Sequence, residues 1–181
     1  MNPLALQNVR ALASAVVAFA ASCDGADKPL LLDERAGTFR GVGLGSSTTD
    51  VRREFGKPGK GEGFFPLEDD VRGPYAFPIP GGGQPFVLRY EHVAFALTGD
   101  RVFGFIVSDR RAVTRRGVGV GDRLNDAREA YPNLTCQAYA GEAIIGDNPT
   151  YTLCRSELGR GRILSFEEDR IRSITLLDLS R

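Results

Sequence analysis

Two segments of this 181-residue chain repeat each other at a spacing of 76 residues. Residues 33–52 read DERAGTFRGVGLGSSTTDVR, and residues 109–128 read DRRAVTRRGVGVGDRLNDAR. Eleven of the 20 aligned pairs are identical without a gap, which is far more than chance produces. Self-similarity at a fixed period indicates that one structural unit occurs twice. We therefore divide the chain into repeat 1, residues 30–105, and repeat 2, residues 106–181.

Each repeat predicts a short helix after a glycine-rich turn. Ser46 and Asp122 follow a Gly-x-Gly-x-Gly run, where a side-chain oxygen can accept a free main-chain N–H and cap a helix. Gly56 and Pro132 are expected to end the two helices. Apolar residues one turn apart give each helix one buried face, Val51 with Phe55 and Ala127 with Tyr131. Because neither helix is long enough to be stable alone, each must pack against a sheet.

Apolar runs after each helix predict strands. In repeat 1, apolar and polar residues alternate over residues 86–97, and the alternation changes phase near His92, which predicts a bulge. A tight turn is predicted at 98–101, followed by a strand over 102–107. In repeat 2, strands are predicted over residues 135–139, 151–155, 162–166 and 171–177. The predicted fold class is α+β, with two tandem repeats that each pack a short helix on an antiparallel sheet of hairpins.

Residues 1–22 are typical of a signal peptide for export. Arg10 is their only charge, and the uncharged run over residues 11–21 is too short to span a bilayer but fits the apolar core of a secretory signal. Two processing sites compete, Ala18-Phe19-Ala20 for ordinary signal peptidase and Ala20-Ala21-Ser22-Cys23 as a bacterial lipobox. In the lipobox interpretation Cys23 is lipidated and residues 23–29 form a tether. Both predict an exported chain, periplasmic or at the cell surface, and the lipobox adds an anchor in a bacterial membrane.

If Cys23 carries the lipid anchor, two cysteines remain, Cys136 and Cys154. An even pair in an exported chain indicates a disulfide. It would close a loop of 17 intervening residues, which contributes roughly 3 kcal/mol in the chain-entropy model. The alternative is a pair of free buried thiols.

The charge balance and the single histidine exclude several function classes. Lys plus Arg and Asp plus Glu are 23 each, so the chain has no overall attraction for nucleic acid. His92 is the only histidine, and no Ser or Cys partner for it is evident in the sequence. The Gly-x-Gly-x-Gly run has neither the spacing of a dinucleotide fingerprint nor the lysine of a phosphate loop. We therefore predict no enzyme activity, no cofactor and no metal site.

A binding surface is predicted in and after the Gly- and Pro-rich stretch over residues 56–85. Aromatic side chains next to flexible loops are typical of interface hot spots. The candidates are Phe64, Phe65, Tyr75, Phe77, Phe86 and Tyr90. The alternative is that half or more of them belong to the hydrophobic core.

One sequence pattern occurs in both repeats and resembles a known superfamily. Gly-Val-x-x-Gly precedes a helix with Asp-Val-Arg at 50–52 or Asp-Ala-Arg at 126–128, then Gly-x-Pro or Tyr-Pro, then hairpins. Over about residues 30–178 this pattern resembles the BamE/SmpA-like and beta-lactamase inhibitory protein-like superfamily of small exported bacterial domains. The inhibitory protein is itself a tandem duplication, so it is the nearer architectural match. The resemblance implies helices packed on an antiparallel sheet and binding to another protein, either to inhibit an enzyme or to support outer-membrane assembly.

These observations together predict an exported, lipid-anchored bacterial envelope protein that acts as a non-catalytic protein-binding module. Its partner would be another protein of the cell envelope, and no nucleic-acid partner is expected. One alternative is an outer-membrane assembly or structural factor. A second is a small hydrolase that uses His92 as a general base.

Overall fold

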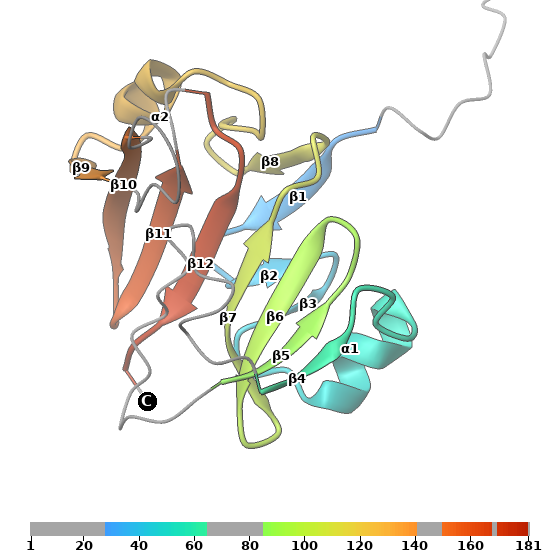
Figure 1. The fold of residues 1–181 in the computed structure, drawn as a ribbon. Helices are drawn as coiled ribbons and strands as arrows, with labels where there is room; N and C mark the ends of the chain where they lie inside the picture. The colour runs from blue at the N-terminus through green and yellow to red at the C-terminus, as the bar shows by residue number, and fades with distance from the viewer. Residues whose placement is uncertain (1–27, 65–84, 141–149, 168–169, 181) are drawn as a thin grey trace, which may run out of the picture.

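Two β-sheets make up most of the structure, a computed structural model that describes residues 28–64, 85–140, 150–167 and 170–180 (Figure 1). The larger sheet has eight strands in the spatial order β4 (Glu62–Phe64), β5 (Phe86–Arg89), β6 (Val93–Thr98), β7 (Arg101–Val107), β12 (Ile174–Asp178), β11 (Arg162–Glu167), β10 (Thr150–Gly159) and β9 (Thr135–Ala140). The smaller sheet has four, in the order β3 (Val42–Gly43), β2 (Thr38–Phe39), β1 (Leu30–Asp33) and β8 (Ala112–Thr114).

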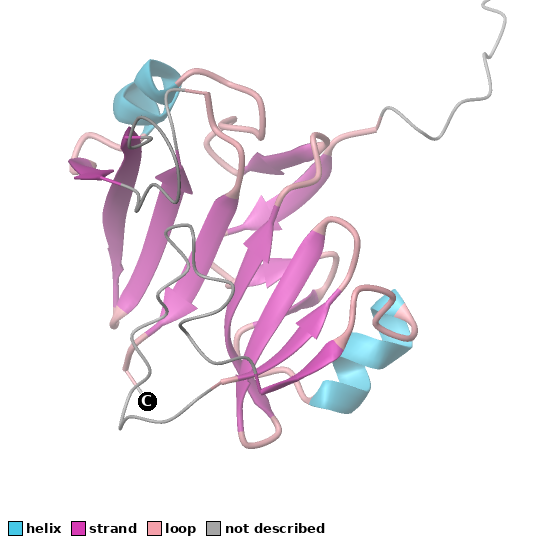
Figure 2. Cartoon of the chain, viewed as in Figure 1, coloured by secondary structure: helices cyan, strands magenta, loops and turns pink. Residues whose placement is uncertain are grey.

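The α+β class predicted from the sequence is wrong, because strands dominate the part of the chain that the structure describes. The helices found there are α1 (Thr48–Phe55) and α2 (Leu124–Ala130), of eight and seven residues. Figure 2 shows both at the margins of the molecule. A helix of this length is about 12 Å long, and neighbouring strands lie about 4.8 Å apart. It therefore spans less than three strands, and the two sheets, rather than helix-on-sheet units, organise the fold.

Both sheets combine strands from the two halves of the chain. In the larger sheet β7 pairs antiparallel with β12, with Phe105 opposite Leu176. In the smaller sheet β1 pairs parallel with β8, with Leu31 opposite Val113. The two halves thus form continuous sheets and share one body.

A row of fully buried side chains crosses the larger sheet. The register places them next to one another on five successive strands, in the order Leu88, Phe95, Phe105, Leu176 and Leu164. Each is 0% exposed. Burial of a side chain of this size stabilises the fold by about 1.5–3 kcal/mol. Because the row passes from the first half of the chain to the second, the core belongs to both.

The predicted helix caps Ser46 and Asp122 have a different role from the one expected. The Gly43 N–H donates to Ser46 Oγ (3.1 Å), and 76 residues later the Gly119 N–H donates to Asp122 Oδ2 (2.7 Å). Both side chains therefore stabilise the glycine-rich turn by a hydrogen bond to its own main chain. The central glycine of the turn is required by space, since a Cβ on Gly43 would overlap the carbonyl oxygen of Gly37.

The helices begin one residue later than predicted, after Ser47 and Arg123. Ser47 Oγ accepts from the Asp50 N–H (3.1 Å), and the Asp50 carboxylate accepts from the Ser47 N–H (3.1 Å). Asp126 accepts from the Arg123 N–H in the same way (3.0 Å). The predicted ends are confirmed, because α1 stops before Gly56 and α2 stops two residues before Pro132. The apolar faces are confirmed too: Val51, Ala127 and Tyr131 are buried, and Phe55 is half-buried.

The change of phase near His92 is a hairpin turn and not the predicted bulge. β5 ends at Arg89 and β6 begins at Val93, and the Tyr90 N–H donates to the Val93 carbonyl (2.9 Å) to close the turn. The next predicted turn is confirmed between β6 and β7. Gly99 has a φ of 59° there, a left-handed conformation that glycine adopts at little cost.

The predicted disulfide is confirmed. Cys136 on β9 and Cys154 on β10 are bonded and directly opposite each other in the antiparallel pair, with Cα atoms 4.0 Å apart. The bond ties the outermost strand of the larger sheet to its neighbour. Within the described ranges, no helix is long and apolar enough to cross a membrane.

Replacement of Gly43 by Ala tests the close approach in the turn. The added methyl group would overlap the Gly37 carbonyl and lie 2.7 Å from Thr38 Cα, so we expect the free energy of unfolding to fall by about 2 kcal/mol or more. Gly59→Ala is the matched control, because a Cβ there meets no atom within 4 Å. Its effect should stay within about 0.5 kcal/mol in guanidinium unfolding. Equal stability of the two variants would contradict the packing described.

Candidate functional site

A basic groove lies where the two halves of the chain meet. Its walls are the turns after β1 and β8, the residues that follow α2 and the hairpin between β10 and β11, and its volume is about 820 Å³. We call it the arginine groove after the five arginines that line it, Arg35, Arg115, Arg116, Arg160 and Arg162. The acidic residues in its lining are Glu34 and Glu157.

The turn after β1 presents Arg35 to the arginine groove. The Gly37 N–H donates to the Asp33 carbonyl (2.7 Å), and the Asp33 carboxylate accepts from the N–H groups of Arg35 and Ala36 (3.1 and 2.9 Å). Hydrogen bonds from Ala36 and Arg115 hold the pKa of Asp33 below its ordinary value, so this carboxylate stays charged at neutral pH. Short-range hydrogen bonds thus set the conformation of this wall.

Three of the five arginines are held in place by contacts. Arg115 Nη1 lies 2.8 Å from Asp33 Oδ2. Arg116 Nη1 donates to the Ala130 carbonyl (2.6 Å), and its guanidinium lies over the Tyr131 ring, 4.8 Å from the centroid. Arg162 Nη1 donates to the main-chain carbonyl of Arg35 (2.7 Å).

Arg35 and Arg160 are the arginines available to a ligand. Both residues are exposed, and neither side chain has a hydrogen bond or ion pair with any residue that the structure describes. Arg160 lies at the tip of the β10–β11 hairpin with a φ of 54°. A guanidinium presents a planar set of donors that matches a carboxylate or phosphate. The groove is therefore suited to an anionic group.

The floor of the arginine groove is a buried hydrogen-bonded pair. Glu34 is 4% exposed and Tyr131 is 1% exposed. Glu34 accepts from the Tyr131 hydroxyl (3.2 Å) and from the Arg115 N–H (3.0 Å). Burial raises the pKa of Tyr131, which keeps the hydroxyl protonated and able to donate. The pair joins residues 97 positions apart in sequence.

The equivalent position in the first half of the chain has different chemistry. Arg40 lies over the Phe55 ring (4.7 Å to the centroid), as Arg116 lies over Tyr131 76 residues later. However, Arg40 Nη2 is paired with Glu54 Oε1 at 2.9 Å. The hollow beside Arg40 also contains Glu91 and Asp109, so its charge is mixed.

His92 lies on the surface at the rim of that hollow. Its side chain is 56% exposed, and Nε2 lies 3.9 Å from Glu91 Oε1. The residues described around the hollow include no Ser, Thr or Cys. Nor do the described ranges contain a group of three or more His, Cys, Asp or Glu side chains that could hold a metal ion.

The aromatic candidates do not gather in one exposed patch among the residues whose side chains are described. Phe86 and Tyr90 are half-buried and pack against the core. Tyr90 lies 5.4 Å from Phe55 between ring centroids, and its hydroxyl donates to the Gly56 carbonyl (3.1 Å). Phe64 belongs to β4, but its side chain is outside the description. Phe65, Tyr75 and Phe77 lie outside the described residues, as does Cys23.

No family model, curated protein or solved structure matches this chain. We therefore infer function from the geometry of the arginine groove. Sequence reasoning missed the arginine groove because its arginines come from three distant segments and the total charge is zero. One sequence signal was available: two arginines lie close together in the chain beside a turn glycine, at Arg115-Arg116-Gly117 and again at Arg160-Gly161-Arg162.

Tyr131→Phe tests the floor of the arginine groove. Loss of the hydroxyl leaves the buried Glu34 carboxylate with one donor fewer, so the free energy of unfolding at pH 7 should fall by about 1–3 kcal/mol. Because the pKa of Tyr131 is raised in the folded state, its hydroxyl loses its proton at a lower pH in the unfolded state, near pH 10. The stability that Tyr131 contributes should therefore be lost as the pH rises above about 10. Urea unfolding of both proteins from pH 8 to 11 would measure this, and a difference that stays constant would contradict it.

Proposed function

We propose that this chain is a non-catalytic protein-binding module and that its arginine groove binds an acidic segment of the partner. The observation that carries the proposal is the imbalance of charge in one open groove. Five arginines and two glutamates line the groove, and one of the two, Glu34, is already bonded to Tyr131 and Arg115. Arg115 is also paired with Asp33, and four arginines remain without a paired carboxylate among the described residues. Arg35 and Arg160 remain to pair with carboxylates of a partner.

Protein is a better occupant than nucleic acid for two physical reasons. A nucleic-acid site needs a broad positive surface, and this chain has equal numbers of acidic and basic side chains. Single strands are also held by stacking on exposed aromatic rings. The ring that lines the arginine groove, Tyr131, is 1% exposed and already covered by Arg116.

We further propose that the chain is exported and anchored by a lipid on Cys23, and that the partner is a protein of the cell envelope. The Cys136–Cys154 disulfide supports an oxidising compartment. The apolar run at residues 11–21, followed directly by Ser22-Cys23, supports a processed signal. The motif resemblance to BamE/SmpA-like and beta-lactamase inhibitory protein-like domains supports protein binding as the class of function.

Charge reversal tests the arginine groove. The probe is a fluorescent decaglutamate peptide at low ionic strength, with affinity measured by anisotropy. Exposed ion pairs contribute up to about 1 kcal/mol each, so the double variant Arg35→Glu with Arg160→Glu should bind about tenfold more weakly or worse. Added salt should weaken binding to the original protein, because exposed charges are screened.

The matched control is Lys57→Glu with Arg110→Glu. It changes the net charge by the same amount at exposed positions outside the arginine groove, so its affinity should stay within about twofold of the original. If both double variants lost the same affinity for the peptide, the loss would come from the change in net charge and not from the arginine groove. Failure of the unmodified protein to bind the peptide would overturn the proposed function.

Processing in a bacterial host tests the anchor. We expect a membrane-bound product whose intact mass corresponds to a chain that begins at Cys23 and carries a diacylglyceryl group. Cys23→Ser should lose the lipid mass and leave the membrane fraction. A soluble product that begins at Ala21 would show cleavage after Ala20 and free secretion instead.

A further inference from the structure

β9 is the outermost strand at one end of the larger sheet, and among the described strands it pairs with β10 alone. Four of its residues, Thr135 to Ala138, are exposed. An outer strand carries main-chain N–H and C=O groups that have no partner within the sheet, and another extended chain can pair with them. β9 therefore has the geometry of a strand-addition site.

The register identifies which groups point outward. In an antiparallel pair, directly opposite residues alternate between hydrogen-bonded pairs with Cα atoms about 5.5 Å apart and non-hydrogen-bonded pairs about 4.5 Å apart. The Cα atoms of Cys136 and Cys154 are 4.0 Å apart, so this pair is of the second kind. The N–H and C=O of Cys136 thus point away from β10, and so do those of Ala138, two residues later. Among the described residues, no hydrogen bond is formed to them.

The sequence of β9 lacks the features that usually protect an outer strand. In natural proteins, charges, proline, bulges or short length prevent an outer strand from pairing with another chain. β9 reads TCQAYA over six residues, with no charge, proline or glycine. At the opposite end of the same sheet, β4 has three residues, of which Glu62 is charged and Gly63 has a φ of 155°. The disulfide also holds β9 against β10, which reduces the ordering that binding would require.

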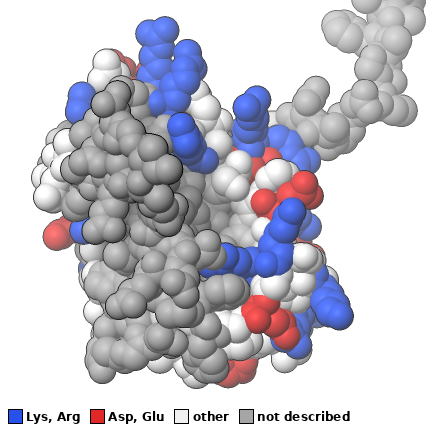
Figure 3. All heavy atoms as spheres, viewed as in Figure 1, with Lys and Arg blue, Asp and Glu red and all other residues white. Residues whose placement is uncertain are grey.

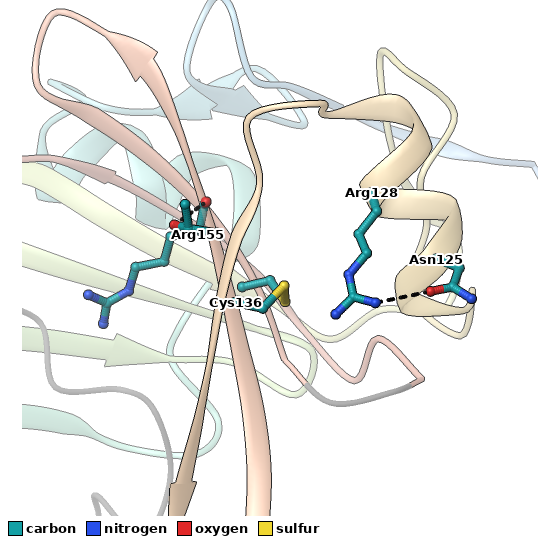
Figure 4. The surroundings of a disulfide bond; sticks show 6 residues. Asn125, Arg128, Cys136 and Arg155 are labelled. Atoms are coloured by element: carbon teal, nitrogen blue, oxygen red, sulfur yellow. Dashed lines mark hydrogen bonds between the residues drawn. A yellow bond between two sulfur atoms is a disulfide. The ribbon is translucent and has the colours of Figure 1, made fainter.

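Two basic side chains, Arg155 and Arg128, lie near this edge (Figure 4). Arg155 on β10 lies opposite Thr135, and it is exposed. Figure 4 shows Arg155 on one side of the disulfide-linked ribbons and Arg128 of α2 on the other. Arg123, Arg128 and Arg170 line a shallow hollow beside α2. In Figure 3, Lys and Arg side chains gather at the upper end of the molecule, where Figure 1 places α2.

The edge also adjoins the arginine groove. Pro132 and Asn133 line the groove, and β9 begins two residues later at Thr135. Ser156 to Arg160, from the end of β10 and the hairpin tip, line it as well. A chain laid along β9 can therefore continue toward Arg160.

We propose that an extended acidic segment of the partner adds to β9 as a further strand of the larger sheet. Its main chain pairs with the outward groups of Cys136 and Ala138. Its carboxylates lie near Arg155 and Arg128 and continue into the arginine groove. This inference rests on the proposed function and specifies how the partner is held.

Ala138→Pro tests the main-chain pairing. Proline is tolerated on an outer strand where its nitrogen faces solvent, and it removes the outward N–H. Ala138→Thr is the matched control, because it keeps the N–H and suits a strand. The probe is a labelled peptide of alternating glutamate and threonine, compared with the same peptide N-methylated at every residue. We expect Ala138→Pro and the methylated peptide each to lower affinity by about tenfold, and Ala138→Thr to bind like the original protein.

Hydrogen exchange of the unmodified protein gives a readout that does not depend on the folding of a variant. Added peptide should slow exchange of the outward amides of Cys136 and Ala138, while the amide of Gln137, which faces β10, should change little. Full binding by Ala138→Pro and by the methylated peptide, with no change in exchange, would overturn strand addition. If Arg35→Glu with Arg160→Glu nevertheless weakened binding about tenfold or more, the proposed function would stand without strand addition. A dimer of the unmodified protein that Ala138→Pro dissociates would instead assign the edge to a second copy of this chain and overturn the proposal.

Discussion

The antiparallel pairing of β7 with β12 is the interaction on which the rest of the structure depends. It places Phe105 beside Leu176 and Val107 beside Ile174, and all four side chains are 0% exposed. Without this pairing each half would leave the apolar edge of a four-stranded sheet in water. The cost of exposing such side chains is about 1.5–3 kcal/mol each. The two halves are therefore stable as one body, and the shorter β1–β8 pair joins them a second time.

The arginine groove is a consequence of that junction. Arg35 comes from the first half of the chain, whereas Arg116 and Arg160 come from the second. The buried bond between Glu34 and Tyr131 crosses the same boundary. The corresponding arginine of the first half, Arg40, is neutralised by Glu54. Two copies of one local arrangement thus differ in their charge balance, because Arg116 donates to a main-chain carbonyl where Arg40 pairs with a carboxylate.

Much of the local structure was predictable, because it is set by residues close in sequence. The positions of both helices, the turn at Gly99 and the pairing of Cys136 with Cys154 follow from short patterns. The fold class and the turn at His92 were predicted wrongly. A change of phase in an alternating run fits a bulge or a turn equally well, and the hydrogen bond from Tyr90 to Val93 decides between them. The groove was not predicted at all, since its arginines lie up to 127 residues apart.

The sequence by itself determined the repeated glycine-rich turns and the two short helices, because neighbouring residues satisfy one another's hydrogen bonds and conformational limits. The cysteine count predicted the disulfide. Only the tertiary structure decided the order of the strands, the sharing of one core and the placement of Arg35 and Arg160 in one groove. The physical reason is that strand propensity says where a strand forms but not which strand it pairs with. Partner choice follows from burial of a whole row of side chains in register, and that row spans both halves of the chain.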